Sequence, residues 1–181
     1  MLGQLQRTNL NHVFDTLDLT RDGFLTVDDF TTLAQRMRGL RPAMDGRLAA
    51  DIDEAFTSWW EVFRSAADKD GDGKITRDEF LTAVEEGLQN DPAYADRMAR
   101  VCEVTFAAAD TNEDGQLSAS EVQQIYRAYG VDEKISAETF ARLDRDGNGW
   151  ISVEEFVQAS RDVYLSNDAD APGTALFGAT S

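Results

Sequence analysis

The stretch DKDGDGKITRDE, at residues 68–79, decides the fold. Aspartates stand at its first, third and fifth positions, a glycine at its sixth and a glutamate at its twelfth. Ca²⁺ takes six to eight oxygen ligands at about 2.3–2.6 Å. A twelve-residue loop supplies them from alternate side chains, the position-seven carbonyl and a bidentate position-twelve carboxylate, if the chain turns sharply at position six. The stretch therefore predicts a calcium-binding loop.

Three further twelve-residue segments repeat the pattern. They are DLTRDGFLTVDD at 18–29, DTNEDGQLSASE at 110–121 and DRDGNGWISVEE at 144–155. In chain order we call the four segments loops one to four. They hold 17 of the 34 acidic residues in 48 positions, so the negative charge is concentrated at four places.

Loops two to four satisfy every position of the pattern, which makes the prediction specific. The predicted ligands, with the position-seven residue donating its carbonyl, are Asp68, Asp70, Asp72, Lys74 and Glu79; Asp110, Asn112, Asp114, Gln116 and Glu121; and Asp144, Asp146, Asn148, Trp150 and Glu155.

Loop one departs from the pattern twice. Its predicted ligands are Asp18, Thr20, Asp22, the Phe24 carbonyl and Asp29. Thr20 offers a hydroxyl at position three, and Asp29 is one methylene shorter than a glutamate. A shorter carboxylate reaches the ion with both oxygens less easily, and fewer oxygens favour Mg²⁺ or weaker Ca²⁺ binding. We expect three strong calcium sites and one weaker Ca²⁺ or Mg²⁺ site.

Position eight is apolar in every loop, as Leu25, Ile75, Leu117 and Ile151. An apolar residue there indicates a short strand that pairs with a neighbouring loop, first with second and third with fourth. Loops two to four also end in Thr-x-x-Glu or Ser-x-x-Glu, the capping-box signature of a helix start. Caps alone explain the last acid but not the earlier oxygens, so we expect both roles.

The segments around the loops carry apolar residues at the three-and-four spacing of amphipathic helices. The sequence therefore predicts an all-α fold of helix–loop–helix units in two pairs, 1–89 and 90–166, followed by a tail, 167–181. Asp91 is expected to cap, and Pro92 to open, the first helix of the second pair. Leu176 and Phe177 would be wasteful on a frayed terminus, so we expect the tail to pack in the groove between the pairs, although a disordered tail is the alternative.

The formal net charge of −17 argues against nucleic-acid partners and anionic membrane surfaces, which both need a basic face. One cysteine, Cys102, excludes an internal disulfide, and the opening MLGQLQRTNLNHVF lacks the apolar core of a signal peptide. We expect a cytoplasmic monomer. Trp59 and Trp60 are expected in the core, Cys102 as a buried thiol and His12 at the surface or at an interface.

With these loops, the chain resembles the calerythrin and sarcoplasmic calcium-binding protein family of EF-hand proteins. The first-ligand spacings of 50, 42 and 34 residues, the first loop ending in Asp29 and the tail from Asp168 to Phe177 carry the resemblance. It implies a compact fold of four EF-hands, metal binding in loop one, and a cytosolic buffering or transport role. Calerythrin has a degenerate second loop, whereas loop two is intact here.

Three classes of function remain from the sequence. A calcium buffer is the leading hypothesis, and a sensor that exposes an apolar groove to a target protein is the alternative. A photoprotein-like enzyme would need polar His and Tyr groups around a cavity, and the chain holds a single His. We expect no enzymatic activity.

Overall fold

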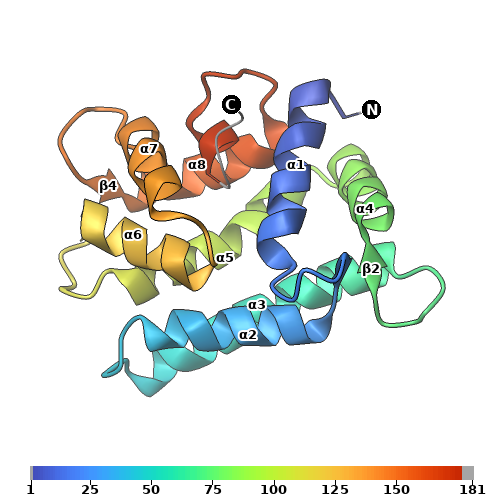
Figure 1. Cartoon of the computed structure of the whole chain (residues 1–181), viewed down its shortest axis with the longest axis horizontal. Helices are drawn as coiled ribbons and strands as arrows, with labels where there is room; N and C mark the ends of the chain where they lie inside the picture. The colour runs from blue at the N-terminus through green and yellow to red at the C-terminus, as the bar shows by residue number, and fades with distance from the viewer. Residues whose placement is uncertain (1, 177–181) are drawn as a thin grey trace.

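The computed structural model describes residues 2–176, except for the side chains of 133 and 175. Over that range the chain forms eight α-helices, four two-residue strands and a short 3₁₀ helix, η1 (Figure 1). They are α1 (Gln4–Leu17), β1 (Phe24–Leu25), α2 (Val27–Gly39), α3 (Gly46–Ala67), β2 (Ile75–Thr76), α4 (Arg77–Asn90), α5 (Tyr94–Ala109), β3 (Gln116–Leu117), α6 (Ala119–Ala128), α7 (Glu133–Leu143), β4 (Ile151–Ser152), α8 (Val153–Leu165) and η1 (Pro172–Ala175).

The strands join the loops in two antiparallel pairs. Leu25 lies opposite Ile75 in the first pair, and Leu117 lies opposite Ile151 in the second. All four side chains are fully buried. The predicted pairing of loop one with loop two and of loop three with loop four is confirmed.

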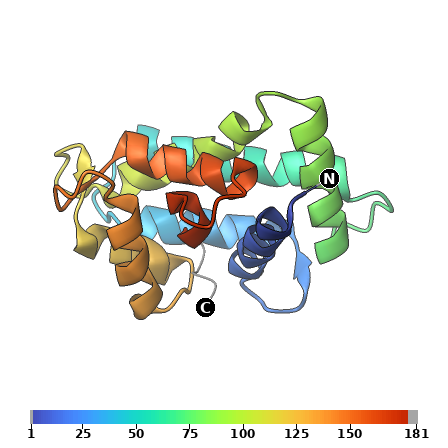
Figure 2. The same ribbon diagram turned by 90° about the horizontal axis from the view of Figure 1, so that it is seen from above.

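The two pairs of helix–loop–helix units, α1–α4 and α5–α8, pack side by side into one body. We call each of them a helix pair below. The long helices α3 and α5 contact each other through the middle, and α1 lies between α4 and α8 (Figures 1 and 2). After α8 the chain turns back and lays η1 against α7 and α8. Within 2–176, no helix has the length and apolar content that crossing a membrane requires.

An aromatic cluster fills the core of the first pair. Phe63 is fully buried, and its ring centroid lies 5.1 Å from that of Phe80 and 5.9 Å from that of Trp59. Phe30 packs edge-on against Trp59 at 5.5 Å. Trp59 and Trp60 are about 95% buried, at 5% and 4% exposure, so their predicted place in the core is confirmed.

One predicted helix start is wrong. The first helix of the second pair begins at Tyr94, two residues after Pro92. The Asp91 side chain accepts the Ala93 N–H at 2.9 Å, and the Tyr94 N–H bonds back to the Asp91 carbonyl at 3.0 Å. Asp91 and Pro92 therefore form a turn that ends α4, and the helix starts only after the turn closes.

Replacing Phe63 with alanine should lower the free energy of unfolding by about 3–5 kcal/mol, because it leaves a cavity between two aromatic rings. Leu165 is 57% exposed, so Leu165→Ala is the matched control and should change stability by less than about 0.5 kcal/mol. Urea unfolding at a fixed free calcium concentration measures both. Equal effects of the two variants would contradict the position of Phe63 in the core.

Candidate metal sites

The aspartate at position one organises each loop. Its carboxylate accepts the N–H of the position-six glycine in all four loops: Gly23 to Asp18 at 2.9 Å, Gly73 to Asp68 at 3.2 Å, Gly115 to Asp110 at 2.9 Å and Gly149 to Asp144 at 2.9 Å. These bonds fold the first half of the loop around the carboxylate. They leave further lone pairs of the same oxygens directed into the loop.

Two loops bring three carboxylates together. Asp68, Asp70 and Asp72 in loop two each place an oxygen within 4.8 Å of the others, and Asp144, Asp146 and Glu155 do the same in loop four. Ligands on opposite sides of one Ca²⁺ lie about 5 Å apart, given bonds of about 2.3–2.6 Å. The donors in these loops are all hard oxygens at the spacing that one calcium ion needs.

Backbone amides hold the acid at position twelve in place. Glu121 accepts the Thr111 N–H at 3.1 Å with one oxygen and the Ser118 N–H at 2.9 Å with the other. Glu155 makes the equivalent bonds to Arg145 and Ser152, at 3.1 and 2.9 Å. The serine hydroxyls cap the helices in return, so the expected capping box is present in these loops.

Asp29 makes the same bonds in loop one despite its shorter side chain. One oxygen accepts the Leu19 N–H at 3.1 Å, and the other accepts the Thr26 N–H at 2.9 Å. Because Asp lacks one methylene, its backbone, and with it the first turn of α2, has less freedom to move without breaking these bonds. A glutamate can swing its carboxylate further without moving its helix.

Loops one and three bury their first and last acids. Asp18 and Asp29 are 7% and 1% exposed, and Asp110 and Glu121 are 8% and 5% exposed. Burial alone would raise the pKa of the Glu121 carboxyl, but hydrogen bonds from Ser118 and Thr111 outweigh it and hold that pKa below its usual value. Since buried carboxylates need a compensating partner, a bound cation suits both loops.

Position four of every loop has left-handed backbone, a feature that the sequence analysis missed. Gly71 and Gly147 supply it in loops two and four, at φ of +74° and +70°. Arg21 and Glu113 supply it in loops one and three, at +56° and +59°. The glycines at 71 and 147 were the available signal, because left-handed residues other than glycine cost about 1–2 kcal/mol.

The remaining predicted ligands line the same loops. At position three, the Thr20 hydroxyl donates to Asp18 at 3.3 Å, and the Asn112 amide donates to Asp114 at 2.8 Å. At position five, Asp22, Asp72 and Asn148 accept the N–H groups of the position-seven residues Phe24, Lys74 and Trp150 at 2.8–3.0 Å. The Trp150 side chain is 41% exposed. Gln116 starts β3, and Glu79 accepts the Thr76 N–H at 2.9 Å.

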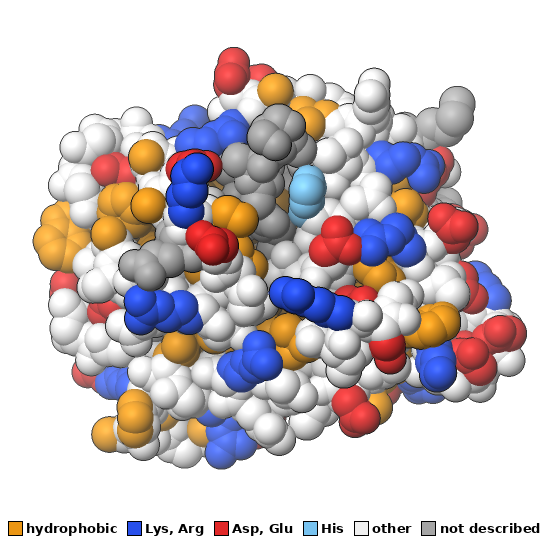
Figure 3. Space-filling view, viewed as in Figure 1, with side chains coloured by type: hydrophobic (Ala, Val, Ile, Leu, Met, Phe, Trp, Pro, Cys, Tyr) orange, Lys and Arg blue, Asp and Glu red, His pale blue; other side chains and the backbone are white. Residues whose placement is uncertain are grey.

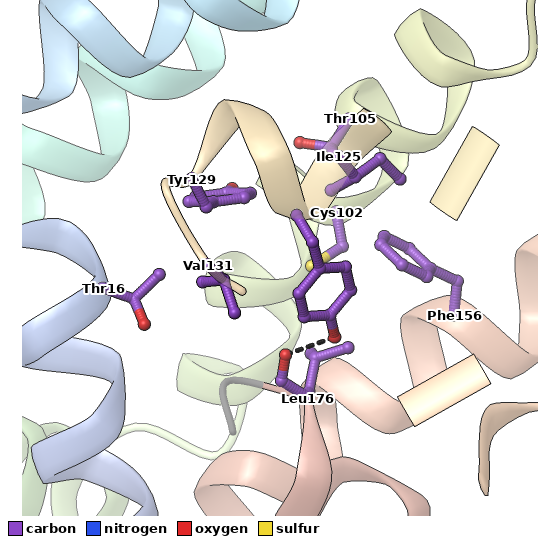
Figure 4. A pocket seen from close by; sticks show the side chains of 9 residues that line it. Thr16, Cys102, Thr105, Ile125, Tyr129, Val131, Phe156 and Leu176 are labelled. Carbon is purple, nitrogen blue, oxygen red and sulfur yellow. Dashed lines mark hydrogen bonds between the residues drawn. The ribbon is translucent and has the colours of Figure 1, made fainter. Parts of the chain in front are cut away.

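Outside the loops, an apolar cavity lies within the second pair. It is lined by residues from four helices, the turn after α6 and the tail (Figure 4). They are Thr16 of α1, Cys102 and Thr105 of α5, Ile125 and Tyr126 of α6, Tyr129 and Val131 just after α6, Phe156 of α8 and Leu176 of the tail. The Tyr126 hydroxyl donates to the Leu176 carbonyl at 2.5 Å. Cys102 is half-buried rather than fully buried, and burial raises the pKa of its thiol to about 11.

A second, more open cleft of about 470 Å³ shares Thr16, Tyr129 and Val131 with this cavity. His12 lines the cleft together with loop one and the turn between α6 and α7. His12 is thus partly buried at a cleft between the two pairs, which fits the expected surface or interface position.

Replacing Gly147 with alanine should destabilise the protein by about 1–2 kcal/mol, because the new Cβ meets left-handed backbone. Nothing lies within 4 Å of that Cβ, so the cost is in the backbone alone. Gly39→Ala, in the last turn of α2 and also with open space, is the control and should stabilise by about 0.4–1 kcal/mol. Thermal unfolding in chelator measures both, and effects of the same sign would contradict the loop geometry.

Comparison with known proteins places these loops in a family. The EF-hand domain pair model matches residues 7–85 and 98–161. Calerythrin from Saccharopolyspora erythraea is 28% identical over 157 residues, covering 84% of this chain and 88% of its own. The sarcoplasmic calcium-binding protein of Hediste diversicolor is 28% identical over 165 residues, covering 91% and 92%.

A solved structure agrees with this assignment. A calcium-binding protein of Streptomyces coelicolor superposes with a TM-score of 0.74 at 26% identity, covering 88% of this chain and 97% of its own. Its structure is described in terms of prokaryotic calcium-mediated regulation. With two matched domain pairs over most of its length, the chain belongs to the EF-hand family and is similar to calerythrin and the sarcoplasmic calcium-binding proteins.

Proposed function

We propose that this protein binds Ca²⁺ in its four loops and acts mainly as a cytosolic calcium buffer or transport protein. The carrying observation is the convergence of three carboxylates within 4.8 Å in loops two and four. Loop three contributes the same donor types around a buried Asp110 and Glu121. The calcium-binding relatives support the choice of metal.

Loop one is the weaker site in this proposal and takes Ca²⁺ or Mg²⁺. Both Asp29 oxygens accept backbone N–H groups of the loop. Glu121 and Glu155 make the same bonds in loops three and four, so the difference lies in the length of the side chain: Asp29 brings its oxygens less far toward an ion. Thr20 adds a neutral oxygen where loops two and four have Asp70 and Asp146.

Asp29→Glu should raise the calcium affinity of loop one by about tenfold, because it restores a bidentate ligand. Titration calorimetry of the wild-type protein should show three tight sites and one weaker site, and four tight sites in the variant. Fewer than three tight sites in the wild type would contradict the proposal, as would a variant whose weak site is unchanged.

The tail favours a buffer over a sensor, because it closes an apolar cavity. Leu176 is 5% exposed, and burying such a side chain contributes about 1.5–3 kcal/mol before ordering entropy is subtracted. Arg142 of α7 donates to the Ala169 carbonyl at 2.6 Å and to the Thr174 hydroxyl at 3.1 Å. Gly173 lies so close to α8 that an added Cβ would collide with the Ala159 carbonyl. Phe177, expected to pack beside Leu176, lies outside the described residues.

Deleting residues 172–181 should cause a large rise in binding of a hydrophobic fluorescent dye to the calcium-loaded protein, because it uncovers Ile125, Tyr126 and Phe156. Gly173→Ala should imitate the deletion, since the tail cannot then seat against α8. Gly46→Ala, with open space around its Cβ, is the matched control. Strong dye binding by the intact loaded protein would overturn the buffer proposal in favour of a sensor.

The sensor remains the second candidate because of one relative. The Streptomyces coelicolor protein is described in terms of calcium-mediated regulation. A groove between α2 and α3, lined by Phe30, Ala34, Phe56 and Trp60, is where a protein target would bind. A target is possible but not required for the function proposed.

We propose a monomer in a reducing cytoplasm, without enzymatic activity and without nucleic-acid or membrane partners. The single Cys102, the net charge of −17 and the single His12 support this. Catalysis of the photoprotein type would need His and Tyr groups that converge on a cavity, and the one histidine of the chain does not line the cavity that holds Tyr126 and Tyr129.

A further inference from the structure

Two arginines at the end of α2 reach across to the other helix pair. The Arg36 guanidinium donates to the Ala128 carbonyl, at the last residue of α6, at 2.9 Å. Arg41, two residues after α2, forms an ion pair with Glu113, at position four of loop three. Lys and Arg side chains gather over α2 and the neighbouring end of α6 (Figure 3). The exit helix of the first unit thus contacts the loop and the exit helix of the third unit.

The two contacts bind different parts of the third unit, Arg36 the end of its exit helix and Arg41 its loop. Arg36 places a positive charge at the C-terminus of α6, where the helix dipole is negative. The turn after α6 already supplies N–H groups to the carbonyls of Ile125, Tyr126 and Arg127, and Arg36 bonds the Ala128 carbonyl that follows them. Arg41 holds the side chain of Glu113, whose left-handed backbone lies between the predicted ligands Asn112 and Asp114. A displacement of α2 therefore acts on both the loop and the helix that follows it.

The opposite end of α2 carries Asp29 in its first turn. To coordinate an ion in loop one, this short carboxylate has to approach the loop centre. The bonds from Leu19 and Thr26 are already at 3.1 and 2.9 Å, so the side chain has little slack and the first turn of α2 moves with it. The glutamates of loops two to four have one more methylene to absorb such a movement.

Loop one also faces the third unit directly. Asp18 and Arg21 line the cleft of about 470 Å³ together with Arg36 of α2 and with Gly130 and Val131, which follow α6. Arg36, which reaches this cleft, therefore lies next to both loop one and the end of α6. By contrast, Arg38 on the same helix pairs with Asp53 of α3 at 3.1 Å, inside its own helix pair.

The geometry points to α2 as a lever that couples metal binding in loop one to metal binding in loop three, through Arg36 and Arg41. The inference rests on the proposed function, since both loops must bind metal. The coupling runs between the two helix pairs, and is separate from the β1–β2 and β3–β4 pairing within each. Linkage requires it to be reciprocal: filling loop three must change the affinity of loop one by the same factor.

The test is a double-mutant cycle on the full chain. Loop one is disabled by Asp18→Asn, and the calcium affinity of loop three is followed through the amide resonance of Gly115, whose N–H donates to Asp110 at 2.9 Å. We expect the loop-three affinity to differ by about fivefold or more between the two backgrounds, the lower end of usual coupling factors. In the Arg36→Ala, Arg41→Ala background, the factor should fall to about one.

Matched variants separate the lever from charge alone. Arg38→Ala removes a positive charge from α2 without touching the other pair, and should leave the coupling factor unchanged. Glu113→Gln removes the same ion pair from the side of loop three. The decrease in the coupling factor that it causes should therefore not add to the decrease caused by Arg41→Ala. Asp29→Glu should strengthen loop one yet weaken the coupling, because the longer side chain reaches the ion without moving α2.

The outcomes distinguish this inference from the proposed function. If neither loop titrates with calcium, the proposed function fails. If both titrate but the coupling factor is one in the wild type, or survives loss of both arginines, the lever is wrong. Should the double-arginine variant not fold, Glu113→Gln and the Arg36→Ala single variant test the same two contacts, and an unchanged factor in both overturns the inference.

Discussion

The structure depends on a carboxylate at the twelfth position that bonds to two parts of its loop at once. In loops one, three and four it joins the second residue to the residue that caps the exit helix, as Asp29 does between Leu19 and Thr26. The ligand set and the helix direction are therefore fixed together. Helices attached in this way present their apolar faces at defined angles. The paired strands then place the side chains of Leu25 and Ile75 in the core between these faces.

This arrangement brings several carboxylates together in each loop, and the loops differ in how deeply they bury them. Loops one and three bury their first and last acids, whereas the corresponding Asp68 and Glu79 of loop two are only partly buried. Backbone N–H groups compensate the buried carboxylates, and the low pKa of Glu121 reflects that. The buried acids gain most from a cation, since hydration cannot replace it there. Loop one thus resembles loop three in the burial of its acids, although loop one departs furthest from the calcium-loop pattern in its ligands.

The loops and their pairing could be predicted from the sequence because metal coordination fixes residue types at fixed offsets. The helices around the loops could be predicted from the three-and-four spacing of their apolar residues. The contacts of Arg36 with Ala128 and of Arg41 with Glu113 could not be predicted, since single long-range contacts leave no periodic trace. The start of α5 was misplaced because Pro92 fits a turn as well as a first helical position. Packing of the tail was expected from Leu176 and Phe177, of which only Leu176 is among the described residues, and Gly173 and Arg142 gave no signal in advance.

Both units of the second helix pair are held by segments that lie outside it. The tail fastens the fourth unit through Arg142 of α7 and the close approach of Gly173 to α8. The end of α2 fastens the third unit through Ala128 and Glu113. The helix angles of this pair are therefore set by the whole chain and not by its own loops alone. An isolated fragment 90–166 would lose both restraints together with the Thr16 wall of its cavity, so its calcium affinity would not be that of the intact protein.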